Sequence, residues 1–525
     1  MRELNEECGI IALYHLAGGE ASPLCPSQGR NEVSRLAPRM LLDLQNRGQL
    51  STGITTYHPN SKRLLSTYKD NGTVSEVFHV GKRDRYNQIM DEHAAYAAIG
   101  HTRYAAGGQE DRSNAQPFER HHIKKHKWFS IVFNGQLANY NELKKQLLSD
   151  HDTHLSHETD TEIIMHYLCS ALKEEKHDLL TVCQKMSSRL DGSYCLAYLN
   201  ALGQMFVARD PLGIKPLLYA FDGSLFAAAS ESVALFNLGF PEESIKNVAP
   251  GEIIMIDENG IKFERFAEST RSAHCFFEWG YFANVASTLD GKSVYLARKH
   301  LGEELALQED LPLDNDCIVV PVPDTSKAAA DGMAYALKIP CLEGLIRNRY
   351  TGRTFIEGYV SRWRRAETKY TPLREVLENK RVFLVEDSIV RSTTMRVLIE
   401  RIRKVGKARE INVRVACAPI IAPCFYGVDM STYSELFASR FFLKDGKEPA
   451  SWVLTREMEA EMCADIGADT LRFLPVDAIS RAIGLPKNHL CEACINNEYP
   501  TPGGCHMAQL AKEKYLNDLK SQDQK

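Results

Sequence analysis

The chain has 525 residues, of which 44% are hydrophobic and 25% charged, so it is long enough for two or three globular domains with large cores. Its formal net charge of -5 gives no electrostatic reason to expect nucleic acid or an anionic membrane as a partner, and no apolar run approaches the roughly 20 residues that span a bilayer. The 14 cysteines are scattered and follow no secretory signal, which favours reduced thiols or metal ligands in the cytoplasm over a disulfide framework.

Cys8 follows a short charged segment, residues 1–7, that lacks the apolar stretch of a secretory signal. We expect this segment to be a propeptide. One cleavage would make Cys8 the N-terminal residue, carrying both a thiol nucleophile and a free α-amine that titrates near neutral pH and can act as its base. The alternative is a free cysteine in an N-terminal strand.

The first half of the chain alternates short apolar runs with turns. Residues 128–133, 194–199 and 205–208 are rich in β-branched and aromatic side chains, which predicts strands. Residues 159–162 fit a capping box, and apolar side chains at helical spacing follow them. This pattern predicts layered β-sheet with helices packed outside.

Three polar segments in this half carry side chains suited to an amino-acid substrate. Arg103, near the end of the GHTRY segment at 100–104, offers a bidentate partner for an α-carboxylate. Asn134 and Gly135 offer an amide and a backbone N–H for an oxyanion hole at the end of a strand, and Asp160 can bind an α-ammonium group. The alternatives are a surface ion pair, a hairpin turn and a helix cap.

Taken together, these segments resemble the N-terminal-nucleophile glutamine amidotransferases. The resemblance rests on Cys8-Gly9-Ile10, QNRGQ at 45–49, GHTRY at 100–104, Asn134-Gly135, TDTE at 159–162 and DPLGIKPL at 210–217. It implies a four-layer αββα domain in which Cys8 attacks glutamine, Asn134 and Gly135 form the oxyanion hole, and Arg47, Arg103 and Asp160 bind the substrate. Asn46 replaces the family's histidine and Leu50 its acidic residue, which leaves open how the Arg47 loop is braced and how fast glutamine is hydrolysed.

The second half contains a strand, a hydroxyl-rich loop and a helix in direct succession. Residues 381–385 predict a buried strand, and an amphipathic helix that ends near Gly406 follows the loop. Such a loop at a helix N-terminus binds anions, and the adjacent Glu386 and Asp387 suit ribose hydroxyls and Mg²⁺. The alternative is a capped surface turn. The candidate phosphate-binding residues are Ser388, Ile389, Val390, Arg391, Ser392, Thr393 and Thr394.

A second unit of the same form precedes this loop. Residues 317–322 predict a strand, Thr325 follows it as a candidate magnesium ligand, and a helix is expected from about Ala328. Two such units indicate a parallel sheet with its ligand at the carboxyl ends of the strands. The basic stretch between the units, with Tyr350, Arg353 and Lys369 as candidates, predicts a lid over an anionic substrate; a solvated basic loop is the alternative.

These segments resemble the type I phosphoribosyltransferases, and the order of the two halves resembles the glutamine phosphoribosylpyrophosphate amidotransferase family from Leu4 to Thr501. The resemblance implies that ammonia from glutamine converts phosphoribosylpyrophosphate to 5-phosphoribosylamine, the first step of purine synthesis. It also implies Mg²⁺ at Thr325, Glu386 and Asp387, a homotetramer and inhibition by purine nucleotides. Ser392 replaces a glycine in the family's phosphate loop, so it is either strained at positive φ or a further hydroxyl donor to phosphate.

Cys491 and Cys494 form a Cys-x-x-Cys pair, which needs two more ligands to hold zinc or an iron–sulfur cluster. By resemblance, Cys275 and Cys424 complete the ligands of a 4Fe-4S cluster, and Cys505 is a spare candidate. The alternatives are a zinc site and reduced thiols.

The expected organisation is α/β (α+β overall): propeptide 1–7, glutamine amidotransferase domain 8–270, phosphoribosyltransferase domain 285–490 and a C-terminal segment 491–525. One rival is another amidotransferase of the same nucleophile class, for glucosamine phosphate or asparagine synthesis, which would lack the second-half loop. The other rival is a non-catalytic paralogue that senses phosphoribosylpyrophosphate or glutamine.

Overall fold

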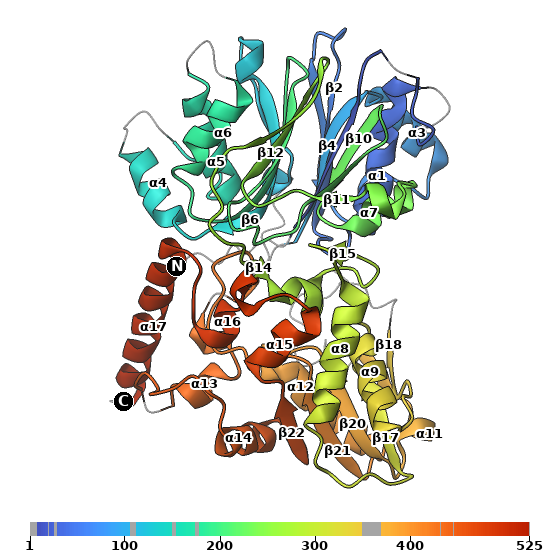
Figure 1. The fold of residues 1–525 in the computed structure, drawn as a ribbon, viewed down its shortest axis with the longest axis vertical. Helices are drawn as coiled ribbons and strands as arrows, with labels where there is room; N and C mark the ends of the chain where they lie inside the picture. Colours follow the sequence, from blue (N-terminus) through green and yellow to red (C-terminus); the bar gives the residue numbers. More distant parts are fainter. Residues whose placement is uncertain are drawn as a thin grey trace.

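The computed structural model describes residues 8–18, 20–25, 29–104, 112–149, 154–173, 178–348, 369–430, 432–444 and 446–523. They form two lobes, the first from the N-terminal half and the second from the C-terminal half (Figure 1). The expected propeptide 1–7 and the candidate residues Tyr350 and Arg353 lie outside the described residues.

The first lobe contains two large antiparallel sheets. The seven-stranded sheet runs in the order β11 (Lys246–Asn247), β9 (Leu218–Phe221), β10 (Leu225–Ala229), β1 (Cys8–His15), β4 (Ala97–Arg103), β2 (Ser51–Tyr57) and β3 (Leu65–Asn71). The six-stranded sheet runs in the order β13 (Gly260–Arg265), β12 (Glu252–Asp257), β8 (Met205–Arg209), β7 (Gly192–Asn200), β6 (Phe129–Leu137) and β5 (Phe118–Arg120). The strands predicted from the sequence at 128–133, 194–199 and 205–208 are confirmed as β6, β7 and β8.

The period of two along these strands sorts their side chains into separate cores. In β1, Ile10 and Ala12 pack between the two sheets, whereas Ile11 and Leu13 face the helices outside. In β6, Val132 faces the other sheet and Phe133 faces the helices of its own side. The covering helices are α1 (Ala37–Asp43) and α7 (Ser232–Leu238) on the first sheet, and α4 (Tyr140–Leu148), α5 (Asp160–Ala171) and α6 (Leu179–Ser187) on the second (Figure 1). Two short helices, α2 (Val74–Val77) and α3 (Arg83–Glu92), flank the first sheet. The result is the expected four-layer αββα arrangement.

Two local predictions in this lobe need correction. Asn134 and Gly135 lie inside β6, which continues to Leu137, rather than at the end of a strand. Thr159 caps α5 by accepting the Glu162 N–H, but the Glu162 carboxylate accepts the Ser156 and His157 N–H groups instead of completing a capping box. The ladder with β7 extends β6 past the Asn-Gly pair, and the N–H groups of the loop before α5 occupy the Glu162 carboxylate.

The second lobe is built on a four-stranded parallel sheet in the order β17 (Cys317–Pro321), β20 (Arg381–Glu386), β21 (Glu410–Val415) and β22 (Thr470–Phe473). Its larger helices are α8 (Val294–Leu307), α9 (Lys327–Leu337), α12 (Ser392–Lys404), α14 (Arg456–Ile466) and α15 (Val476–Ile483). Its shorter elements are β18 (Leu345–Arg347), β19 (Tyr370–Pro372), α11 (Arg374–Leu377) and α13 (Ser439–Phe442). The predicted strands and their following helices are confirmed, so the carboxyl ends of β17 and β20 lie side by side.

Segments from distant parts of the chain meet between the lobes. There β14 (His274–Cys275) pairs with β23 (Leu490–Cys491), and α16 (Ala493–Asn496) and the short hairpin of β15 (Thr288–Leu289) and β16 (Lys292–Ser293) lie nearby (Figure 1). The last helix, α17 (Pro502–Asp523), lies along the outside of the second lobe. Within the described ranges, no helix is long and apolar enough to cross a membrane.

Candidate functional site

Cys8 lies at the start of β1, fully buried, beside the residues predicted to act with it. It pairs in register with Arg103 at the end of β4, and its backbone N–H donates to Asn134 Oδ1 over 3.3 Å. The Asn134 Nδ2 group is buried and has no hydrogen-bond partner among the residues described. A buried amide donor without a partner costs about 1–3 kcal/mol of folding free energy. Because this donor lies next to a nucleophile, we interpret it as one that donates to a substrate oxygen when substrate is bound.

Gly135 lies within β6, and Asp160 contacts the end of the same strand. Gly135 has φ of 152°, and a Cβ there would lie 2.1 Å from the Ser193 carbonyl oxygen, so only glycine fits between β6 and β7. Asp160 is buried at the first turn of α5 and its Oδ1 accepts the Leu137 N–H over 3.3 Å. The structure therefore brings Cys8, Arg103, Asn134, Gly135 and Asp160 to one end of the two sheets.

Arg47, also predicted to bind substrate, makes other contacts. Its Nε donates to Glu231 Oε1 and one terminal nitrogen donates to Glu278 Oε2, each over 2.6 Å, and all three side chains are buried. Glu278 also pairs with Lys215 over 3.2 Å. These contacts make Arg47 part of the joint between the lobes, and its direct contact with glutamine stays a prediction.

The substitution at Asn46 has a structural explanation. The Asn46 Nδ2 group donates to Glu231 Oε1 over 2.8 Å and to the Phe282 carbonyl over 3.0 Å, so asparagine braces the loop. The backbone N–H of Leu50 donates to the Arg103 carbonyl over 3.0 Å, a contact that any residue at position 50 can make.

The second site lies at the carboxyl ends of β17 and β20. Asp387 accepts hydrogen bonds from the hydroxyls of Thr325 and of Ser388, the latter over 2.6 Å. Burial raises the pKa of Asp387, and burial together with the neighbouring Asp387 raises the pKa of Glu386 well above its usual value. Two adjacent carboxylates whose charges are disfavoured in this way are suited to a divalent cation.

The loop that follows leads directly into α12. Ser392 is the first residue of this helix and is absent from the residues with positive φ, so the strain considered for this position does not arise. Its Oγ accepts a hydrogen bond from Arg440 over 3.3 Å, while Thr393 and Thr394 are exposed at the helix N-terminus. Arg391 pairs with Glu435. Ile389 is buried, and the Val390 carbonyl accepts the Phe437 N–H over 2.8 Å.

Two cations border the carboxylate pair. Lys369 lies 4.9 Å from the centre of the Tyr370 ring, and burial lowers its pKa although Glu386 opposes this. Arg298 of α8 is buried, donates to three backbone carbonyls, and lies close enough to Asp387 to lower the pKa of that carboxyl. No local pattern singles out Arg298, because it lies in an ordinary amphipathic helix about 90 residues before Asp387.

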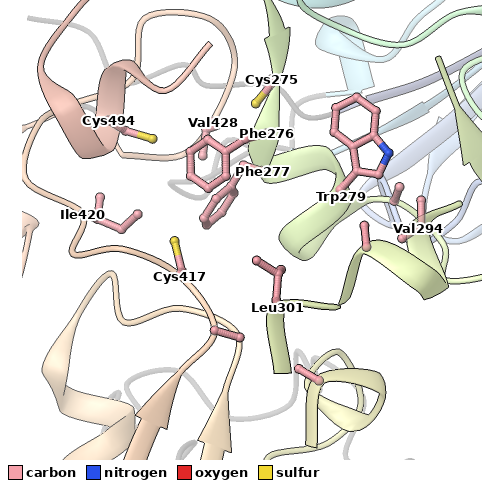
Figure 2. Packing of buried hydrophobic residues seen from close by; sticks show 14 of the residues in the cluster. Cys275, Phe276, Phe277, Trp279, Val294, Leu301, Cys417, Ile420, Val428 and Cys494 are labelled. Atoms are coloured by element: carbon pink, nitrogen blue, oxygen red, sulfur yellow. The ribbon is translucent and has the colours of Figure 1, made fainter. Parts of the chain in front are cut away.

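The four predicted cluster cysteines lie together between the lobes. Cys275 and Cys491 are register partners in β14 and β23, and the Cys494 carbonyl accepts the N–H groups of Ile421 and Ala422, just before Cys424. All four thiols are buried, and Figure 2 shows the sulfur atoms of Cys275 and Cys494 directed toward each other. Burial and the neighbouring thiols raise the pKa of Cys491 and Cys494 well above the usual value.

The described residues nevertheless contain no group of three or more histidine, cysteine or acidic side chains positioned to hold a metal ion. The cysteines therefore converge without forming a closed ligand set. Their chemistry suits iron or zinc, because buried thiolates need a compensating positive charge.

The two lobes define a class: an N-terminal-nucleophile glutaminase fold joined to a phosphoribosyltransferase-type parallel sheet. A family model described as a glutamine amidotransferase domain matches residues 101–237. An amidophosphoribosyltransferase of Methanothermobacter thermautotrophicus is 38% identical, over 95% of this chain and 96% of its own. That of Bacillus subtilis is 34% identical, over 95% of each chain. The chain belongs to the amidophosphoribosyltransferase family, a family of glutamine-dependent transferases.

Two solved structures agree with this assignment over nearly the whole chain. The B. subtilis glutamine phosphoribosylpyrophosphate amidotransferase, complexed with ADP and GMP, is 33% identical with a TM-score of 0.77, over 94% of this chain and 97% of its own. A structure described as the allosteric regulatory enzyme of purine biosynthesis is 33% identical with a TM-score of 0.79, over 94% and 96%.

Proposed function

We propose that the chain hydrolyses glutamine at Cys8 and uses the ammonia to convert phosphoribosylpyrophosphate to 5-phosphoribosylamine and pyrophosphate, the first step of purine synthesis. The observation that carries the glutaminase half is the contact between Cys8 N–H and Asn134 Oδ1, with the Asn134 Nδ2 donor left without a partner among the described residues. A sensing paralogue would have no use for this arrangement of nucleophile and donor.

The proposed glutaminase mechanism uses the first lobe alone. After removal of residues 1–7, the α-amine of Cys8 takes the thiol proton, and the sulfur attacks the glutamine amide carbon. Asn134 Nδ2 and the Gly135 N–H stabilise the oxyanion, while Arg103 and Asp160 hold the α-carboxylate and the α-ammonium group. Ammonia leaves, and water hydrolyses the thioester to give glutamate.

In the second lobe, Glu386 and Asp387 would hold the ribose hydroxyls and Mg²⁺, together with the Thr325 hydroxyl. The raised pKa of the two carboxyls supports this assignment, because a bound cation would remove the repulsion that raises them. Mg²⁺ would supply charge neutralisation for the leaving pyrophosphate. Residues 388–394 would bind the 5′-phosphate through the N-terminus of α12, and Lys369 would contribute positive charge at the diphosphate.

We assign the four cysteines Cys275, Cys424, Cys491 and Cys494 to a 4Fe-4S cluster. Their convergence from three separate segments supports a structural role, because such a cluster would fasten β14, β23 and the 420–424 turn to one another. A zinc ion is the competing occupant.

The remaining parts of the proposal follow the relatives. The ADP and GMP in the B. subtilis structure favour purine nucleotides as effectors, and we expect a homotetramer. None of the 14 cysteines, all of which lie among the described residues, forms a disulfide, which supports a reducing cytoplasmic location. We retain the domain bounds 8–270, 285–490 and 491–525, since the two large sheets end at Arg265 and the parallel sheet begins at Cys317.

The test is pyrophosphate release by purified protein supplied with phosphoribosylpyrophosphate, Mg²⁺ and glutamine, together with the mass of the active chain. We expect release that depends on glutamine, and a mature chain that starts at Cys8. Binding of both substrates without turnover would instead support the sensing paralogue, and an active chain that retains residues 1–7 would exclude the α-amine as the base.

A further inference from the structure

Strand β6, which carries Asn134 and Gly135, has one edge that is not paired with another strand beside these two residues. On one side, β6 pairs with β7 from Phe129 to Leu137. On the other side, β5 pairs only with residues 129–131 of β6. Phe133 therefore lies beyond the end of the β5 ladder, one residue before Asn134.

Two buried side chains take the place of the missing strand. The Phe133 N–H donates to Gln116 Oε1 over 2.7 Å, and the Phe133 carbonyl lies 3.1 Å from His101 Nε2. His101 is completely buried and Gln116 is 1% exposed. Gln116 reaches Phe133 from the segment that leads into β5, whereas His101 reaches it from β4 in the other sheet.

The direction of the His101 side chain follows from the register of β4. His101 pairs with Ile10, which packs between the two sheets, so the imidazole enters the layer between them. Since a carbonyl only accepts, His101 Nε2 must be the protonated nitrogen, and Nδ1 has no partner among the described residues. Burial lowers the pKa of His101 to about 3, so the ring stays neutral and keeps this tautomer at physiological pH.

The Gln116 side chain is itself held in place. Lys69 Nζ donates to the carbonyls on both sides of it, those of Ala115 and Pro117. A Cβ at Gly53 would lie 2.5 Å from the Gln116 carbonyl oxygen, so this segment packs directly on β2. Gln116 is therefore a fixed acceptor rather than a mobile surface amide.

The contact with the Phe133 carbonyl bears directly on Asn134. The Phe133 C=O and the Asn134 N–H belong to one planar peptide unit, so fixing the carbonyl fixes the orientation from which the Asn134 side chain leaves the strand. Asn134 Oδ1 must meet the Cys8 nitrogen while Nδ2 remains directed at the substrate oxygen, and a rotation of this peptide would misalign both.

We propose that His101 and Gln116 are positioning residues for the oxyanion hole. His101 holds the carbonyl of the Phe133–Asn134 peptide, and Gln116 holds the N–H of the preceding Val132–Phe133 peptide, both on the open edge of β6. This inference rests on the proposed glutaminase function. It assigns them no contact with glutamine, so they should affect the tetrahedral states of the reaction and leave binding of the amino-acid end unchanged.

The test compares two ligands of the Cys8 site in His101→Leu, His101→Gln and wild-type protein. The γ-aldehyde analogue of glutamate adds the Cys8 thiol across its carbonyl to form a hemithioacetal, which needs the oxyanion hole, whereas the product glutamate does not. We expect His101→Leu to lower the glutaminase kcat and weaken aldehyde inhibition by about ten- to a hundredfold, less than the loss of a direct oxyanion donor, with glutamate inhibition and the KM for glutamine within about twofold. His101→Gln, which keeps an N–H donor at similar reach, should recover most of both losses.

Gln116→Leu removes the other of these two contacts and provides the same comparison if His101→Leu does not fold. His15→Leu is the matched control, because His15 is a buried histidine at the far end of β1 that bonds Leu16 and Ser22 instead. Equal weakening of aldehyde and glutamate, no change in either, or failure of His101→Gln to recover activity would overturn the proposal. Wild-type protein that neither hydrolyses glutamine nor binds the aldehyde would instead overturn the proposed function itself.

Discussion

His93 links stability to pH through its burial between α3 and β2. It is 6% exposed, and burial, with a smaller contribution from His58, lowers its pKa to about 4 from 6.5. Between these values the unfolded chain binds the proton and the folded chain does not, so the contribution of His93 to stability falls as pH drops from 6.5 to 4 and is constant below that. The loss amounts to up to about 3 kcal/mol.

Replacing His93 should remove this part of the pH dependence. We expect the unfolding midpoint of His93→Phe in urea to change less between pH 6.5 and 4.5 than that of wild type. His506→Gln, at an exposed position on α17, serves as the control and should follow the wild-type curve. A wild-type slope in His93→Phe would show that other groups, such as His101, supply the whole effect.

Asp387 is the carboxylate on which the proposed transferase site should depend most. Its two oxygens accept the hydroxyls of Thr325 and Ser388, and it neighbours Glu386 where Mg²⁺ would bind. Asp387→Asn removes the charge but keeps the size, so glutamine- and ammonia-dependent synthesis should both fall by about a hundredfold or more while basal glutaminase survives. Asp310→Asn, on the surface of the same lobe, should leave all three activities unchanged. Unaltered phosphoribosyl transfer in Asp387→Asn would remove this loop from the active site.

The pairing of β14 with β23 brings Cys275 next to Cys491 between the lobes. Removing a cysteine there should show whether a metal site stabilises this region. Protein purified without oxygen should contain about four iron and four sulfide per chain if the cluster forms. Cys491→Ser should lose the iron and also unfold more readily, because metal-binding energy contributes to folding energy. Cys183→Ser is the control, since Cys183 is buried in α6 in a different hydrophobic core from the four candidate ligands, and its change should leave iron content intact. Stoichiometric zinc would support a four-cysteine metal site but rule out the iron–sulfur cluster. An active protein without metal would rule out both the metal site and the cluster.

The elements that sequence predicted well are those fixed by local signals. The buried strand before Glu386 and the helix after Arg391 appear as β20 and α12, because an apolar run, a hydroxyl-rich loop and an amphipathic period each leave a clear pattern. The sequence predicts Asn134-Gly135 at a strand end, with a hairpin turn as the alternative, whereas the ladder with β7 continues β6 to Leu137.

Contacts between distant residues could not be predicted in the same way. The sequence identified Cys8, Asn134 and Asp387, whose neighbours form recognisable motifs. It did not identify the partners of Arg47, because Glu278 lies 231 residues away, or the bond from His101 to Phe133, 32 residues away in another sheet. Such pairs depend on how sheets and lobes pack, which no local pattern encodes.

The whole molecule places its two proposed reactions in different lobes, joined by buried charges. Arg47 of the first lobe and Lys215 near β9 both pair with Glu278, which lies three residues after the cluster candidate Cys275. In the proposed function, ammonia formed at Cys8 would react at the site of Asp387 in the other lobe, so the two chemistries should be separable by mutation although they share one chain.

The division of the two reactions between the lobes can be tested by measuring pyrophosphate release from phosphoribosylpyrophosphate by Cys8→Ala, once with glutamine and once with added ammonia. We expect the glutamine-dependent rate to disappear, because the nucleophile is gone, and the ammonia-dependent rate to stay within about twofold of wild type. Cys183→Ala should retain both rates. Loss of both activities in a folded Cys8→Ala protein, or retention of the glutamine-dependent rate, would contradict the division of labour between the two lobes.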